Sequence, residues 1–191
     1  MLKILATICI IGMATSSCTS KKASRTESSH EAEPELTMIV GTYTSGDSKG
    51  LYSFRFNEEN GTATALSEAE VENPSYLVPS ADGKFIYAVS EFSNDQAAAN
   101  AFAFNKEEGT FRLLNTQKTE GEDPCYIITN GSNVITANYS GGSISVFPID
   151  KDGSLLPAST VVKFKGSGAD KERQEKPHLH CVRITPDGKY L

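Results

Sequence analysis

The chain has 191 residues, of which 38% are apolar and 22% are charged, with 15 glycines and no tryptophan. This length allows one domain with a substantial core, or at most two small domains. The net charge of −6, without a large cluster of lysine and arginine, argues against nucleic acid as a partner.

The first residues have the pattern of an export signal. Residues 1–3 carry a positive charge, and residues 4–13 form an apolar run that is too short to span a bilayer. Small residues lead to Cys18, as in a bacterial lipoprotein signal, although Thr15 stands where leucine is usual. We expect residues 1–18 to be this signal, with lipid on the Cys18 thiol as the sole membrane anchor and a location in the periplasm or at the cell surface. The alternatives are an ordinary secretory signal cut nearby or, if the signal prediction is wrong, a cytoplasmic protein.

Residues 19–36 are rich in serine, glutamate and lysine and contain few large apolar groups. Such a segment cannot bury enough surface to offset its ordering entropy, so we predict a disordered tether. Beyond it, export would permit a disulfide between Cys125 and Cys181. Both lie in strand-like stretches, which favours two separate buried thiols and leaves pairing as the alternative.

From Thr37 onward the chain shows short strand-like runs separated by turn signals, and no apolar stripe with helical spacing. The domain is therefore predicted to be all-β. The turn signals are Asn60-Gly61, Asp82-Gly83, Asn130-Gly131, Asp152-Gly153 and Asp187-Gly188.

The strand pattern also repeats. A proline, an apolar strand, a tight turn and a second strand recur with prolines at 74, 124 and 177, which are 50 and 53 residues apart. Four strands in about fifty residues is typical of a β-propeller blade. The aligned stretches are NPSYLVPSADGKFIYAVSEF (73–92), DPCYIITNGSNVITANYS (123–140) and KPHLHCVRITPDGKYL (176–191).

This phasing divides residues 37–191 into about three and a half blades. Residues 37–72 hold the last three strands of one blade, residues 73–122 and 123–175 are complete blades, and residues 176–191 open a fourth. A propeller closes with roughly four to eight blades, and an unclosed one exposes sheet edges. We therefore expect this chain to be the N-terminal half of a propeller domain, whose first blade would be completed by the rest of the protein.

Blade geometry places the starts of the innermost strands and the ends of the second strands around one mouth of the central channel. His178 and His180 stand at such a start, on the same side of their predicted strand. A base, a carboxylate and amide donors at one mouth suit the activation of water or the binding of an oxygen-rich ligand. The other polar candidates there are Glu91, Asn138, Tyr139 and Gln174.

Each of these residues also has a purely structural interpretation. The histidines could be hydrogen-bonded strand residues, and Asn138 could belong to a glycine turn. Two histidines on one face could share a metal, but a third ligand is needed and only Glu91 is available, so we predict no metal site. Cys125 stands at a mouth position without a neighbouring base, and we do not expect it to act as a nucleophile.

Taken together and in order, several motifs resemble a known family: the bacterial lactonases with seven-bladed propellers, typified by propeller-type 6-phosphogluconolactonase and related to fungal carboxy-muconate cyclase. The resemblance implies seven blades and hydrolysis of a sugar lactone to the open acid without a metal. We further expect no cofactor, and a monomer when the protein is full length. The resemblance runs from about Met38 to Leu191, on the motifs MIVGTYTSGDSKGLYSF, NPSYL, YAVSE, TANYSGGSISVF and QEKPHLHCVRITPDGKYL.

The resemblance also implies roles for the residues at the mouth. His178 or His180 would serve as general base for attack of water on the lactone carbonyl, and Glu91 would orient that imidazole. Asn138 or Gln174 would donate hydrogen bonds to sugar hydroxyls. Tyr139 would complete the substrate contacts.

The expected export does not fit a phosphorylated lactone, which is a cytosolic compound. A phosphate also favours arginine or lysine at the mouth, and the sequence offers no firm candidate there. Whether the lactone is phosphorylated is therefore open. The alternative to an enzyme is a non-catalytic surface propeller that binds a glycan or a protein at the same mouth, because a fold does not fix chemistry; a lactonising isomerase is a third possibility.

Overall fold

The computed structural model describes residues 35–191, so the expected signal, the lipidation site Cys18 and most of the expected tether lie outside the described residues. The predicted tether, residues 19–36, extends two residues too far. Glu35 and Leu36 belong to the first strand, where they pair with the backbone of Asn57 and Phe56. Within the described range, no helix is long and apolar enough to cross a membrane.

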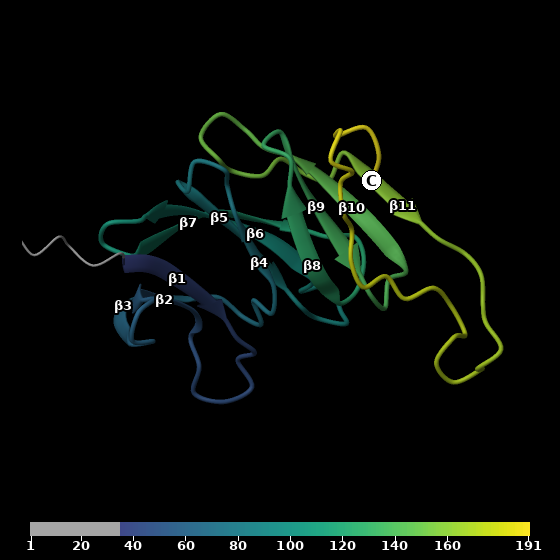
Figure 1. Ribbon diagram of the computed structural model, residues 1–191. Coiled ribbons are helices and arrows are strands. Elements are labelled where there is room, and N and C mark those ends of the chain that lie inside the picture. The colour runs from purple at the N-terminus through teal and green to yellow at the C-terminus, as the bar shows by residue number, and fades with distance from the viewer. Residues whose placement is uncertain (1–34) are drawn as a thin grey trace, which may run out of the picture. The chain divides into compact units, whose positions relative to one another are not determined.

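The described residues form three antiparallel sheets of three, four and four strands (Figure 1). The all-β prediction is therefore confirmed, and the strands of the first three blades lie where the phasing placed them. The first sheet contains β1 (Glu35–Gly41), β2 (Gly50–Asn57) and β3 (Ala63–Glu70). The second contains β4 (Leu77–Pro79), β5 (Phe85–Ser90), β6 (Ala98–Asn105) and β7 (Thr110–Lys118). The third contains β8 (Pro124–Thr129), β9 (Asn133–Asn138), β10 (Ser143–Pro148) and β11 (Thr160–Lys163).

The five expected turns are also present. In each of them the glycine has a positive φ, a conformation that glycine adopts without the steric cost paid by other residues. The values are 73° at Gly61, 69° at Gly83, 86° at Gly131, 88° at Gly153 and 70° at Gly188.

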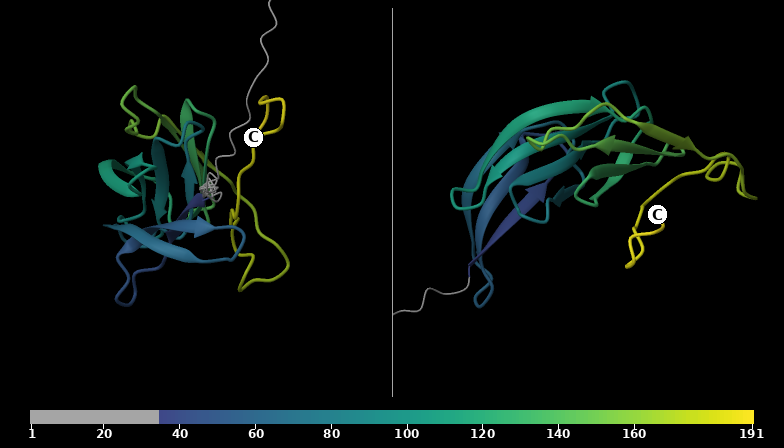
Figure 2. Two further views of the ribbon diagram at one scale, coloured as in Figure 1. Left: turned by 60° about the vertical axis from the view of Figure 1, so that its left-hand side comes forward. Right: turned by 90° about the horizontal axis from the view of Figure 1, so that it is seen from above.

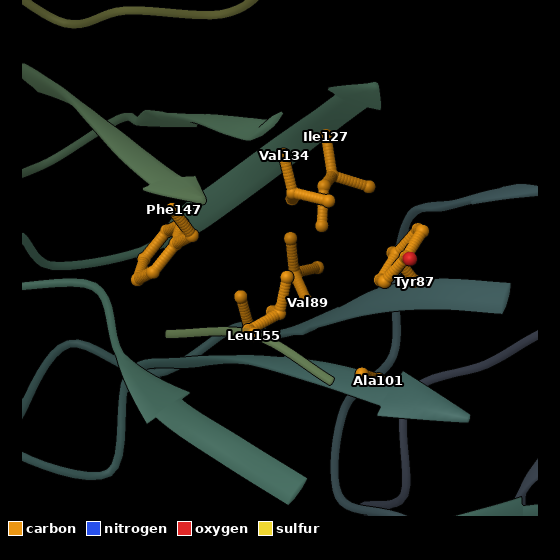
Figure 3. Close-up of a cluster of buried hydrophobic side chains, with 8 residues drawn as sticks. Tyr87, Val89, Ala101, Ile127, Val134, Phe147 and Leu155 are labelled. Atoms are coloured by element: carbon orange, nitrogen blue, oxygen red, sulfur yellow. The ribbon is translucent and has the colours of Figure 1, made fainter. Parts of the chain in front are cut away.

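The core lies between successive sheets and depends on strand alternation. On β5, Ile86 and Ala88 face the first sheet and are buried with Leu51, whereas Tyr87 and Val89 face the third sheet. Since β5 is covered on both faces, it reads as a continuous apolar run. Figure 3 shows the second of these clusters, in which the third sheet contributes Ile127, Val134 and Phe147, and the connection between β10 and β11 contributes Leu155.

The chain after β11 returns to run beside β8 (Figures 1 and 2), where Val182 packs against Ile135 of the third sheet. The strand expected at the start of residues 176–191 is not formed. The predicted turn is present, because Thr185 N–H donates to the carbonyl of Tyr190 at 2.9 Å. Apart from this turn, residues 176–191 form no strand ladder.

Candidate active site

The second strand of each complete blade, β5 in the second sheet and β9 in the third, ends in the same way. Glu91 N–H donates to the carbonyl of Asn73 at 3.0 Å, and Tyr139 N–H donates to the carbonyl of Asp123 at 2.8 Å. Asn73 and Asp123 both have positive φ, 47° and 50°, which asparagine and aspartate tolerate better than most residues. Because the same corner is formed twice, Glu91 and Tyr139 occupy equivalent positions. Tyr43 occupies that position after β1.

Glu91 organises hydroxyl groups rather than a histidine. Its Oε2 accepts a hydrogen bond from the Tyr43 hydroxyl at 2.9 Å and another from the Ser75 hydroxyl. Partial burial, followed by the hydrogen bond to Glu91, raises the pKa of Tyr43. These contacts join a residue that follows β1 to two residues that flank strands of the second sheet, so neighbouring blades contribute to one polar row.

Tyr139 brings the two histidines together. Its ring centroid lies 4.5 Å from that of His178 and 4.7 Å from that of His180. Both imidazoles therefore face the same tyrosine, as the alternation of their stretch predicted, although that stretch has no strand ladder. His178 is mostly enclosed, with 18% of its side chain exposed, whereas His180 is an exposed residue.

The carboxylate beside His178 is Glu175, which the sequence reasoning missed. Its Oε1 lies 3.3 Å from Nε2 of His178, and its Oε2 lies 3.4 Å from the same atom. A backbone hydrogen bond, followed by the contact with His178, lowers the pKa of Glu175. The expectation that Glu91 orients the imidazole is therefore not met in this structure. The spacing of three residues between Glu175 and His178 was the signal that could have revealed the pair.

Only one nitrogen of His178 has a partner among the described residues. Nδ1 is buried and makes no hydrogen bond within residues 35–191. Nδ1 is therefore closed to solvent, and Nε2 is occupied by the contact with Glu175. The exposed His180 is the better placed of the two to meet a water molecule or a substrate.

Asn138 does not line the mouth. Its side chain is fully buried, and its amide nitrogen donates to the hydroxyls of Ser143 at 3.0 Å and Ser145 at 2.9 Å. Its amide oxygen accepts from Thr136 at 3.0 Å. Because both N–H groups are already used, Asn138 has no free donor for a sugar hydroxyl, contrary to expectation.

The second sheet repeats this arrangement with the partners exchanged. Asn100 on β6 donates to the hydroxyl of Ser90 at 2.9 Å. Ser90 at the end of β5 is the residue that matches Asn138 at the end of β9. An amide–hydroxyl pair therefore ties the second strand to the third in both blades. This recurrence indicates a structural role for Asn138.

Gln174 maintains the shape of its own exposed loop. Its backbone N–H donates to the carbonyl of Asp170 at 2.8 Å, and its carbonyl accepts from Gly168 N–H at 2.7 Å. Its side-chain Oε1 accepts the N–H of Asp170 at 3.2 Å. The amide nitrogen stays available for a ligand, but the contacts in this structure do not connect Gln174 to the histidines.

Cys125 and Cys181 are both free thiols. Neither is fully buried, contrary to expectation: Cys125 is half-buried and Cys181 is exposed. The Cys125 thiol lies 3.5 Å from the carbonyl of Leu179 and 3.6 Å from that of His180. Burial, followed by the charge of Glu91, raises the pKa of Cys125, which lowers its thiolate fraction and its reactivity.

The candidate site therefore consists of two polar groups that meet along the starts of the first strands. Glu91 with its two hydroxyl partners forms one group, and the histidines with Tyr139 and Glu175 form the other. The Cys125 thiol, which feels the charge of Glu91 and contacts the backbone of His180, lies between them. An exposed imidazole, a carboxylate-paired imidazole and ordered hydroxyls can activate water and bind a polyhydroxylated ligand.

Comparisons with known proteins agree with this architecture. The family model "Lactonase, 7-bladed beta-propeller" matches residues 37–191. A 6-phosphogluconolactonase of Bacillus subtilis is 37% identical over 158 residues, which cover 80% of this chain and 44% of the relative. The chain spans about half the length of the curated relatives that it matches.

Two solved structures extend the comparison. A Bacteroides fragilis protein, described as a candidate 6-phosphogluconolactonase, is 75% identical with a TM-score of 0.81, over 82% of this chain and 44% of that one. A periplasmic gluconolactonase of Pseudomonas aeruginosa is 31% identical with a TM-score of 0.76, over 82% of this chain and 46% of that one. The Bacillus and Bacteroides proteins are named for a phosphorylated lactone, whereas the Pseudomonas protein is named for an unphosphorylated one.

Proposed function

Because the chain belongs to the lactonase family of seven-bladed β-propellers, we propose that the complete gene product hydrolyses a sugar lactone to the open-chain acid. The observation that carries the proposal is the histidine pair against Tyr139, at a mouth where Glu91 also holds two hydroxyl groups. The names of the Bacillus and Pseudomonas relatives support a lactone as the substrate.

His180 acts as the general base in this proposal. Its imidazole is exposed and makes no hydrogen bond to another group in residues 35–191, so a ring nitrogen can accept a proton from water. The water oxygen attacks the lactone carbonyl carbon while that proton moves to the imidazole. The ring C–O bond then breaks, the ring oxygen takes up a proton and becomes a hydroxyl, and the acid product releases one proton at neutral pH.

The neighbouring groups position this base and the substrate. Tyr139 packs against both imidazoles and limits their rotation. Glu175 holds His178 through the contact with its Nε2. Glu91 orders the hydroxyls of Tyr43 and Ser75, which can donate to or accept from the hydroxyls of the sugar. Asn138 supports the strand end from which Tyr139 projects. The mechanism uses no metal or cofactor.

Export is a separate part of the proposal. The apolar run in residues 4–13, followed by Cys18, supports a lipid-anchored protein outside the cytoplasm. The Pseudomonas relative is named as periplasmic, which supports this part of the proposal. A substrate outside the cytoplasm, whether phosphorylated or not, would be a lactone that the cell meets or forms there.

A direct test is proton release by the gene product without its leader, measured with 6-phosphogluconolactone and with unphosphorylated gluconolactone after subtraction of spontaneous hydrolysis. The proposal predicts turnover of at least one lactone above the background rate. No turnover of either, together with binding of a glycan or a protein at the same mouth, would favour the non-catalytic alternative.

A further inference from the structure

A second row of side chains lies next to the candidate site, one residue further along the first strands. Tyr76 follows Ser75, and Tyr126 follows Cys125, so the two tyrosines occupy equivalent positions in neighbouring blades. Their ring centroids are 4.3 Å apart, with an angle of 36° between the rings. Tyr76 is 39% exposed, so this aromatic surface is open to a ligand.

Arg183 completes the row. Its Nη1 donates a hydrogen bond to the hydroxyl of Tyr126 at 3.1 Å. The hydroxyl of Tyr76, and then Arg183, favour the ionised form of Tyr126 and lower the pKa of that tyrosine. The guanidinium is therefore fixed at one end by a neutral group, while most of its five N–H donors are left for another partner.

Arg183 has no carboxylate partner within residues 35–191, although the whole chain carries a net charge of −6. Other cations of the described residues, Arg112 among them, also form no ion pair with a carboxylate, but Arg183 is distinguished by the tyrosine hydroxyl that holds its guanidinium beside the candidate site. A fixed guanidinium without a countercharge attracts an anion, and its planar fork matches a phosphate.

The short stretch of chain between Arg183 and the candidate base limits how far apart the two residues can lie. Arg183 follows His180 by three residues, so their Cα atoms are at most about 11 Å apart along a fully extended chain. Tyr126, which holds the guanidinium, directly follows Cys125, whose thiol contacts the backbone of His180. A ligand whose carbonyl lies at His180 can therefore present a distal charged group to Arg183.

We infer that Arg183, held by Tyr126 beside Tyr76, binds a phosphate carried by the lactone and sets the preference for a phosphorylated substrate. The inference rests on the proposed function, because it assigns the phosphate-binding residue of the same site. It supplies the cation that the sequence did not reveal at the mouth. The two tyrosine rings provide a flat surface beside the sugar.

The test compares wild type, Arg183→Gln and Arg112→Gln in the complete gene product. Arg112 is an exposed arginine on β7, so its replacement removes the same charge away from the mouth. We expect Arg183→Gln to lower kcat/KM for 6-phosphogluconolactone by about 10- to 100-fold, mainly through KM, since it loses charge-assisted hydrogen bonds. Turnover of unphosphorylated gluconolactone should stay unchanged, as should both activities of Arg112→Gln.

A second variant and a binding measurement keep the inference separate from the proposed function. Tyr126→Phe keeps the ring but frees the guanidinium, and should give a smaller loss with the phosphorylated lactone alone. Binding of the product, 6-phosphogluconate, is measured by calorimetry with wild type and Arg183→Gln. If neither lactone is hydrolysed but Arg183→Gln weakens this binding, the proposed function fails and phosphate recognition stands. Equal effects of Arg183→Gln on both lactones, or no effect on either lactone or on 6-phosphogluconate, would overturn the inference.

Discussion

Glu175 Oε1 lies 3.3 Å from Nε2 of His178, so the mostly enclosed imidazole of the candidate site takes its carboxylate partner from three residues earlier in the chain. Glu91, which was expected in that role, is occupied by the hydroxyls of Tyr43 and Ser75. One short stretch therefore provides an acid–base pair, while Glu91 orders the neighbouring blade positions.

Replacing Glu175 with glutamine tests this pair. The change keeps the shape of the side chain and removes its charge, so we expect kcat for lactone hydrolysis to fall about 10-fold through loss of imidazole positioning. Glu172→Gln, in the same exposed loop, is the matched control and should keep wild-type activity. Equal kcat in all three proteins would show that Glu175 has no part in the reaction.

The same pair predicts how the effect depends on pH. The backbone hydrogen bond and His178 lower the pKa of Glu175, so the contact is present at neutral pH and is lost as the pH falls through that lowered pKa. The ratio of wild-type to Glu175→Gln activity should therefore shrink in acid and be largest near neutrality. A ratio that grows as the pH falls would contradict this assignment.

Tyr139 is predicted to act through its ring. Tyr139→Phe keeps the surface that contacts His178 and His180 and should retain most of the activity. Tyr139→Leu removes the aromatic contacts and should lower kcat about 10-fold, because an imidazole that rotates freely is less often in position. Equal losses in the two variants would instead implicate the hydroxyl group.

Asn138 should affect stability rather than substrate binding. Asn138→Ala leaves the buried hydroxyls of Ser143 and Ser145 without their partner, which costs about 1–3 kcal/mol of unfolding free energy. Chemical denaturation measures this loss, and Asn100→Ala in the second sheet should show a similar one. A large rise in KM with unchanged stability would return Asn138 to the substrate site.

The two thiols should differ in reactivity. Burial raises the pKa of Cys125, so less of its thiolate is present at a given pH, and the sulfur is also less accessible than that of the exposed Cys181. In a protein that begins after Cys18, iodoacetamide at about pH 8 should modify Cys181 at least about 10-fold faster than Cys125. Peptide mass spectrometry follows both sites, and a faster reaction at Cys125 would contradict the burial described for it.

Much of the fold could be predicted because local chemistry determines it. The turn glycines at 61, 83, 131, 153 and 188 specify where strands end, and the proline-led repeat specifies which strands form a sheet. The continuous apolar run of β5 follows from its burial between two sheets. The error at Glu35 and Leu36 arose because composition alone cannot show that the end of a mostly polar segment pairs with a neighbouring strand.

The site was harder to predict, because it depends on contacts between blades. Aligning the prolines put His178 level with Ser75 and Cys125. In the structure, Thr185 makes the same turn hydrogen bond as Ser80, and Val182 packs into the core as Leu77 does. This alignment makes His180, and not His178, equivalent to Ser75. The two additional residues between Pro177 and the turn caused this shift, and no pattern in the sequence marks where they are accommodated.

The most direct test of the account is kcat for lactone hydrolysis by His180→Asn in the complete gene product, on whichever lactone the wild type hydrolyses. With His180 as general base, kcat should fall by about 100-fold or more, because general base catalysis contributes on that scale. The midpoint of thermal unfolding should stay at the wild-type value, since the exposed side chain contributes little to the core. A wild-type kcat in the folded variant would contradict the account.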